Sequence, residues 1–148
     1  MITLRTTFGD DLIDLFNKEL NKKIKTGVRK GMSATGMFLV REIKKDLSKK
    51  SSGSKKDIRY DPKRSVWVSP AGKSPNNDTK ELYNSVSWEL RGDDAVFVGS
   101  EIKKGLWLEE GTKKMKPRPF IKSNAEKKSD QLTSVFEDRF LKYLDKGK

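Results

Sequence analysis

Apolar residues recur at every fourth position along the first third of the chain, and this pattern constrains the fold more than any other feature. Residues four apart lie on one face of an α-helix, so the pattern predicts a long amphipathic helix over about residues 11–48. At 1.5 Å rise per residue, such a helix spans roughly 57 Å, more than a compact domain of this size needs. We therefore expect part of it to reach a neighbouring molecule. The repeating positions are Leu12, Phe16, Leu20, Ile24, Val28 and Met32.

Three glycines, Gly27, Gly31 and Gly36, lie inside this predicted helix. Each weakens a helix by up to ~1 kcal/mol relative to alanine. Two interpretations stay open. The glycines mark either a kink or a close crossing, where a bare backbone lets another element approach.

Residues 49–77 are poor in apolar side chains and rich in serine, glycine, proline and lysine. They are predicted to form a long basic loop, with Ser65–Val68 as a short strand of a hairpin. At about 29 residues this connection is longer than most, and such loops are usually functional or mobile.

The other predicted elements are short, apart from a last helix. Ile2–Thr7 alternates like a strand, and Asp78 and Thr79 are predicted to cap a helical turn that includes Glu81. The most regular pattern is a β-hairpin, with strands over about residues 86–90 and 95–99. Leu106, Trp107 and Leu108 are predicted to lie in a short helical or irregular segment that ends at Gly111. A final helix over residues 122–144 places Leu132, Val135, Phe136, Phe140 and Tyr143 on one face.

These elements predict one domain over residues 1–148, of the α+β class. The long N-terminal helix is expected beside a small antiparallel sheet with a hairpin, with the C-terminal helix packed on the sheet. Hydrophobic residues make up 33% of the chain and charged residues 36%. The core is therefore expected to be thin, with part of the apolar surface buried only on assembly.

The formal net charge is +12 at pH 7. Basic residues gather on the long helix, in the loop and in residues 101–125, whereas residues 76–100 are acidic overall. This distribution has two interpretations: a solvated lysine-rich surface, or a face that binds an anionic partner.

The sequence does not predict an enzyme. It has no cysteine and no histidine, which removes thiolate metal ligands and the commonest general base. A carboxylate nuclease would need Asp57, Asp61 and Lys63, which lie in the loop without core strands to hold them around a cation. Glu109 and Glu110 are adjacent, so on a helix they point about 100° apart and do not form a catalytic pair. We expect no catalytic, metal or cofactor-binding residues.

No segment of the sequence predicts a membrane location. The N-terminal MITLRTTFGDDL lacks the apolar stretch of a signal peptide, and no run approaches the length of a membrane span. We expect a soluble protein made in a cytoplasm, with no membrane partner.

The tryptophans and the lysines suggest binding surfaces. Trp88 is expected in the core, and Trp67 or Trp107 in an interface. Lysines 113, 114 and 116 form a basic cluster with Arg118. A basic accessory protein that binds DNA without reading its sequence is therefore an alternative function, and its contacts would be to phosphates.

Two blocks of sequence resemble one family. The stretch WLEEGTKKMKPRPFIKSNAEK is similar to a segment of the tail-completion, or head–tail joining, proteins of long-tailed bacteriophages. That family has an aromatic-rich segment, Glu-x-Gly-Thr, a basic spacer, Arg-Pro-Phe and a C-terminal helix. The matching positions are Glu109 or Glu110, Gly111, Thr112, Met115, Arg118, Pro119 and Phe120.

The second block, SPAGKSPNNDTKELYNSV, comes earlier in the chain and in the same order as in the family. Lys80 departs from the family pattern, which usually has glycine there. The matching positions are Pro70, Gly72, Pro75, Asp78, Thr79, Leu82, Ser85 and Val86.

The resemblance implies a structural role in the virion. Such proteins form a ring, of six or twelve copies, between the head connector or stopper proteins and the tail terminator or tail tube. The chain would then be assembled in the bacterial cytoplasm and located in the phage neck. Lys113, Lys114 and Lys116 would face a partner or the passing genomic DNA, without sequence readout.

In that setting, Arg118 has two interpretations. It pairs with a carboxylate, Glu109 or Glu110, within the chain or across a subunit boundary, or it is an ordinary exposed arginine between two prolines. In the first case, Arg118→Ala should impair ring assembly more than folding.

Overall fold

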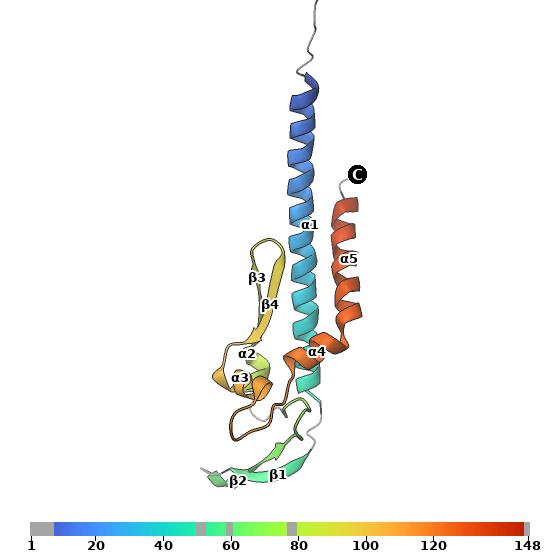
Figure 1. Cartoon of the computed structure of the whole chain (residues 1–148). Coiled ribbons are helices and arrows are strands. Elements are labelled where there is room, and N and C mark those ends of the chain that lie inside the picture. The colour runs from blue at the N-terminus through green and yellow to red at the C-terminus, as the bar shows by residue number, and fades with distance from the viewer. Residues whose placement is uncertain (1–7, 50–52, 59–60, 77–79, 147–148) are drawn as a thin grey trace, which may run out of the picture.

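The computed structural model describes residues 8–49, 53–58, 61–76 and 80–146, and the predicted α+β class is confirmed (Figure 1). The strands form two separate antiparallel pairs, β1 with β2 and β3 with β4. The elements are α1 (Phe8–Leu47), β1 (Ser54–Ile58), β2 (Asp61–Val68), α2 (Glu81–Ser85), β3 (Val86–Arg91), β4 (Ala95–Ser100), α3 (Lys103–Glu110), α4 (Ile121–Lys127) and α5 (Ser129–Asp145).

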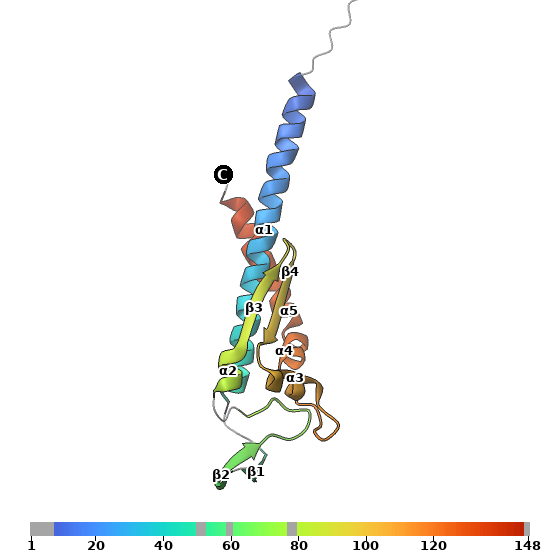
Figure 2. The same ribbon diagram turned by 90° about the vertical axis from the view of Figure 1, so that its left-hand side faces the viewer.

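Helix α1 is the axis of the molecule and runs for 40 residues without a break. Helix α5 lies along one side of it and the β3–β4 hairpin along another (Figures 1 and 2). The expectation that the C-terminal helix packs on the sheet therefore needs correction, because α5 packs on α1. The N-terminal part of α1 extends well beyond both neighbours.

The glycines of α1 mark close crossings and not a kink. A Cβ atom on Gly31 would lie 2.6 Å from the ring of Phe136 on α5, and one on Gly27 would lie 3.0 Å from the ring of Phe140. Those two rings are stacked, with centroids 5.8 Å apart. The missing side chains let the aromatic face of α5 lie against the backbone of α1.

A third glycine serves the β3–β4 hairpin in the same way. A Cβ atom on Gly36 would lie 2.7 Å from Val96 and 3.0 Å from Trp88. Trp88 thus packs on α1, although it is only partly buried. The sequence pattern predicted this hairpin, which pairs Val86 with Ser100 at its base and Arg91 with Ala95 at its tip.

Replacing Gly31 by alanine is expected to lower the free energy of unfolding by about 1–2 kcal/mol. Better helix propensity offsets up to ~1 kcal/mol, but the methyl group overpacks the contact with Phe136. Urea unfolding measures this loss. In a Phe136→Leu background the same change should cost little, and an equal cost in both backgrounds would contradict the assigned contact.

The core is thin and lies at the C-terminal end of α1. Phe120 and Ile43 are fully buried at its centre. Its buried hydrophobic residues, among those described, are Leu39, Ile43, Leu47, Leu82, Val86 and Phe120. Large apolar side chains elsewhere stay exposed, including Phe16 at 68% and Trp107 at 53%.

The segment predicted as a long loop contains more strand than expected. β2 covers and extends the predicted strand at Ser65–Val68. β1 runs antiparallel to it, with Ser54 opposite Val68 at one end and Ile58 opposite Asp61 at the other. The prediction missed β1 because its sequence, SKKDI, has no apolar alternation. The side chains of Asp57 and Asp61 lie outside the described residues.

The predicted strand at residues 2–7 lies outside the described residues. Asp78 and Thr79, which were predicted to cap α2, also lie outside them, so the turn before α2 is described only in part. Lys80 precedes the helix with φ 58, in the left-handed region, and provides no side-chain cap. Glycine adopts that region at the least steric cost. This observation gives a physical reason for a glycine at this position in the resembling family.

The predicted final helix is two helices. Lys128 leaves helical geometry, with φ −112 and ψ 10, and separates α4 from α5. Its ammonium group lies 3.5 Å from the carboxylate of Glu42 on α1. This contact links the bend at Lys128 to α1. The apolar pattern of the sequence did not predict the bend, because its partner Glu42 is distant in the chain.

Candidate functional site

The candidate site is the elbow, defined as residues 109–122, which carries the chain from α3 into α4. Helix α3 precedes it and exposes Leu106 at 55% and Trp107 at 53%. The elbow contains most of the residues for which the sequence predicts an assembly role.

Glu109 holds the start of α4. Its carboxylate accepts three backbone N–H groups: Oε2 from Phe120 at 2.8 Å and Ile121 at 3.0 Å, and Oε1 from Lys122 at 2.8 Å. The first N–H groups of a helix have no partner within it, and a carboxylate there also meets the positive end of the helix dipole. One side chain at the end of α3 therefore fixes the position of α4.

Arg118 does not pair with either glutamate within the chain, so that part of the hypothesis is wrong. Its Nε donates to the carbonyl of Ser69 at 2.9 Å, and its backbone N–H donates to Leu108 at 2.7 Å. Glu109 is already occupied by backbone N–H groups, and Glu110 is exposed. Arg118 thus ties the elbow to the end of β2 and to α3.

Gly111 ends α3 in a conformation that only glycine adopts readily, with φ 80 and ψ −176. A Cβ atom there would lie 2.8 Å from the carbonyl oxygen of Met115 and 2.9 Å from the nitrogen of Pro117. The next residues close a tight turn, in which Thr112 and Met115 exchange backbone hydrogen bonds of 2.8 and 3.1 Å.

The predicted basic residues lie on this turn. Lys113 and Lys114 occupy its two central positions, Lys116 follows it, and all three side chains are exposed. The turn therefore presents three ammonium groups to solvent in one place.

Other residues of the resembling motifs are structural within the chain. Phe120 is fully buried and Leu82 is 4% exposed, so both belong to the core. Pro119 is partly buried between Arg118 and Phe120. The buried side chains of Phe120 and Leu82 cannot contact a partner directly in this conformation; they position the residues that can.

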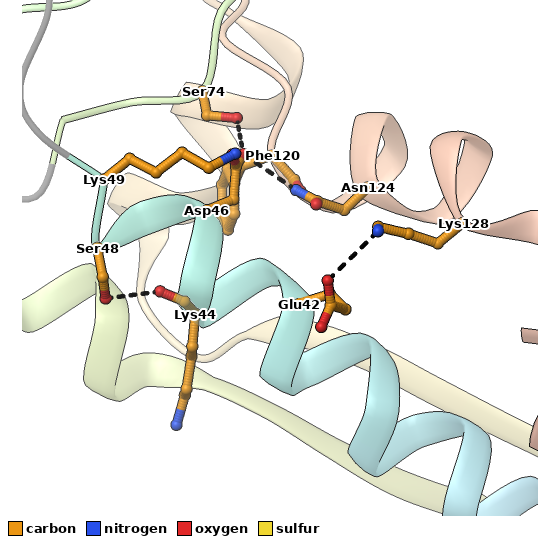
Figure 3. A network of polar contacts seen from close by, with 9 residues as sticks. All are labelled: Glu42, Lys44, Asp46, Ser48, Lys49, Ser74, Phe120, Asn124 and Lys128. Atoms are coloured by element: carbon orange, nitrogen blue, oxygen red, sulfur yellow. Dashed lines mark hydrogen bonds and ion pairs between the residues drawn. The ribbon is translucent and has the colours of Figure 1, made fainter. Parts of the chain in front are cut away.

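A polar network also joins the C-terminal end of α1 to α4 (Figure 3). The carboxylate of Asp46 accepts hydrogen bonds from Lys49, from Ser74 in the loop and from Asn124 of α4 at 3.2 Å. Asn124 also donates to the carbonyl of Phe120 at 2.7 Å. The sequence pattern did not single out Asp46, because nothing local indicates its partners 28 and 78 residues away.

The ionised form of Asp46 stabilises this network. Burial opposes its ionisation, but the hydrogen bonds from Lys49, Ser74 and Asn124 outweigh it, and the pKa of Asp46 lies below its ordinary value. A lowered pKa in the folded state stabilises the fold above the unfolded value of about 3.9. That stabilisation is lost as the pH falls through the folded value.

Asp46→Asn is therefore expected to unfold more easily than the original chain at neutral pH. The difference in unfolding free energy between the two should shrink as the pH is lowered below about 4, because the original carboxylate becomes protonated. Urea unfolding at several pH values measures it. A difference that stays constant down to pH ~2 would show that the charge of Asp46 contributes nothing.

A pocket of about 200 Å³ lies beside the elbow, between the end of β2 and α3. Trp67, Leu108, Met115 and Arg118 are among its lining residues, and Trp67 is 50% exposed. Ser69 also lines it, and its buried hydroxyl group has no hydrogen-bond partner in the described structure.

The described residues include no group of three or more acidic side chains that could hold a metal ion. None of the helices described is long and apolar enough to cross a membrane.

No family model, curated protein or solved structure matches the chain.

Proposed function

We propose that this chain is a structural subunit of the neck of a long-tailed bacteriophage, where a ring of its copies joins the head connector to the tail tube. One observation carries the proposal: the elbow is fixed from within the chain, while large apolar side chains around it stay exposed. The contacts of Glu109, Gly111 and Arg118 are made within the chain and hold the elbow in position. Burial of Trp67 and Trp107 would stabilise a monomer, yet both side chains remain about half exposed.

Such an arrangement suits a subunit and not an enzyme. Exposed aromatic residues are characteristic of the centres of protein interfaces. A rigid elbow lowers the entropy lost when these side chains dock on a neighbour. The order of the two sequence blocks adds independent support. On this proposal the ring has six or twelve copies, its neighbours are connector or stopper proteins and tail terminator or tube proteins, and it uses no cofactor.

Electron microscopy of negatively stained samples tests this function. The purified chain is imaged alone and after mixing with isolated tails that lack their neck. We expect closed rings, or density added at the proximal end of the tails. Tails that remain unchanged, together with an absence of rings, would overturn the proposal.

The alternative is a basic accessory protein that binds DNA without sequence readout, and the three exposed lysines of the elbow turn favour it. Phosphate contacts release counterions, so such binding weakens steeply as salt rises. Titration with duplex DNA between about 50 and 200 mM salt separates the two functions. The neck proposal predicts weak binding at ~150 mM salt, whereas tight binding at that salt would favour the alternative.

A further inference from the structure

The pocket beside the elbow, which we call the elbow pocket, is enclosed by segments that are distant in the sequence. Arg118 donates from Nε to the carbonyl of Ser69, and its backbone N–H donates to the carbonyl of Leu108 on α3. The backbone N–H of Gly72 donates to the carbonyl of Pro117 at 2.9 Å. These contacts tie the segment after β2 to the elbow and to α3, so the fold itself holds the walls of the pocket.

The walls of the elbow pocket are largely apolar. Trp67 from β2, Leu108 from α3 and Met115 from the elbow turn are among the residues that line it. Trp67 is 50% exposed, so part of its surface is open to an occupant. The volume of about 200 Å³ is below the roughly 300–1,000 Å³ of pockets that hold drug-sized ligands. The pocket therefore fits one apolar side chain better than a whole small molecule.

The charged residues that line the elbow pocket are cations. Arg118 and Lys104 line it, and none of its described lining residues is acidic. Lys104 makes only a long contact of 3.8 Å with the exposed Glu81. The two terminal nitrogens of Arg118 have no hydrogen bond or ion pair within the described structure. A guanidinium group held in place through Nε offers its remaining N–H groups in a geometry that matches a carboxylate.

A buried hydroxyl group lies at the same pocket. Ser69 is 3% exposed and lines the pocket, and its Oγ atom has no hydrogen-bond partner within the described structure. Folded proteins rarely leave a buried polar group unpaired. An occupant that brings an acceptor oxygen to Arg118 can also give this hydroxyl a partner, once the side chain of Ser69 rotates about its Cα–Cβ bond.

We propose that the elbow pocket binds a short acidic segment of a partner protein, in which an aromatic side chain is followed by aspartate or glutamate. The aromatic ring packs against Trp67 and Met115, whose indole and thioether groups favour such contacts, and the carboxylate meets Arg118. The choice of a neighbouring neck protein as the partner rests on the proposed function. One pocket of this size binds weakly, but a ring presents one pocket per copy, and linked contacts bind far more tightly than a single one.

Titration with short peptides tests the site. The probe is Gly-Phe-Glu-Gly, with a fluorescent dye at its N-terminus and an amide at its C-terminus, and binding is followed by fluorescence anisotropy at ~150 mM salt. We expect a dissociation constant on the order of 0.1–1 mM. Gly-Phe-Gln-Gly and Gly-Ala-Glu-Gly should each bind at least ~10-fold more weakly, because one lacks the charge and the other the ring.

The three peptides also exclude a general attraction between charges. The chain has a net charge of +12 and attracts any anionic peptide. Equal binding of the Phe-Glu and Ala-Glu peptides would show only this attraction and would overturn the site. Equal binding of the Phe-Glu and Phe-Gln peptides would overturn the assignment of a carboxylate to Arg118. No binding of the Phe-Glu peptide at ~10 mM would overturn the inference as a whole.

Two tryptophans of similar exposure provide a matched pair of variants. Trp67→Ala removes part of the apolar wall and should weaken binding of the Phe-Glu peptide at least ~10-fold. Trp107, which is 53% exposed, is not among the lining residues, so Trp107→Ala should leave the binding unchanged. Equal losses in the two variants would show that the peptide binds elsewhere.

A third variant changes the charge of the elbow pocket. Met115→Glu adds a carboxylate to the pocket that Arg118 lines, and should also lower the affinity at least ~10-fold. Circular dichroism should be unchanged, because Met115 is only partly buried. An affinity that stays the same in a folded Met115→Glu chain would overturn the site.

The outcomes separate this inference from the neck proposal. Rings, or binding to tails, without selectivity among the peptides would overturn the inference and leave the neck proposal standing. Selective binding by a chain that forms no rings and joins no tails would support the site and overturn the neck proposal. Trp67→Ala and Met115→Glu should leave ring formation unchanged. Loss of rings in both variants would assign the pocket to a second copy of this chain and overturn the choice of a different partner.

Discussion

Glu109→Ala is expected to lower the free energy of unfolding by about 2–3 kcal/mol and the melting temperature by about 5–10 °C. The loss is large because one carboxylate accepts the backbone N–H groups of Phe120, Ile121 and Lys122. Removing it leaves the first turn of α4 without partners, next to the fully buried ring of Phe120. Urea unfolding followed by circular dichroism measures the change.

The adjacent residue provides a matched control. Glu110 has the same side chain and helix but is exposed, so Glu110→Ala should change stability by less than ~0.5 kcal/mol. Glu109→Gln keeps one acceptor oxygen and should lie between the two. Equal losses for Glu109→Ala and Glu110→Ala would show that the three hydrogen bonds do not hold the elbow.

Gly111→Ala is expected to be at least as damaging, with a loss of about 3 kcal/mol or more. The φ and ψ of Gly111 are reached readily only by glycine, and the added methyl group would meet the carbonyl of Met115 and the nitrogen of Pro117. Because backbone atoms are involved, a rotamer change cannot relieve the contact. Thermal unfolding measures the loss, and the elbow turn should also become more sensitive to proteolysis.

Gly72→Ala separates backbone strain from the steric clash. Gly72 also has a positive φ, of 76, but a Cβ atom there would meet nothing within 4 Å. Its substitution should cost only the strain of a left-handed residue, roughly 1–2 kcal/mol. If Gly111→Ala costs no more than Gly72→Ala, the close packing of the elbow is not required for stability.

The sequence predicted the elements whose signal is local. The four-residue repeat located α1 to within three residues at its N-terminal end and one at the other, because apolar side chains recur at helical spacing along much of it. Alternation located β3 and β4, and the structure adds their register and the short turn that Gly92 begins with φ 69. The apolar face of α5 was also correct, since the residues predicted on it are partly buried.

The sequence did not predict features that depend on contacts between distant segments. The end of α4 is set by Lys128 and its partner Glu42 on α1, and Asp46 acquires its role from Ser74 and Asn124. Three glycines in a helix are equally compatible with a kink until α5 and the hairpin are placed against them.

The candidate site was predicted in position but not in detail. The segment from Glu109 to Phe120 is a structural unit, as its sequence suggested. Of the interpretations left open for Arg118, pairing with Glu109 or Glu110 within the chain was wrong, because the sequence gives no sign that the carboxylate of Glu109 caps the next helix. The residues that remain free for partners are Trp67, Leu106, Trp107 and the three lysines of the turn.

Light scattering coupled to size exclusion tests the central claim, that the chain is a ring-forming subunit, most directly. The neck proposal predicts a molar mass that is a multiple of 16.9 kDa, about 101 kDa for six copies, and unchanged by duplex DNA at ~150 mM salt. A mass of 16.9 kDa at every concentration, rising only when DNA is added at that salt, would contradict it.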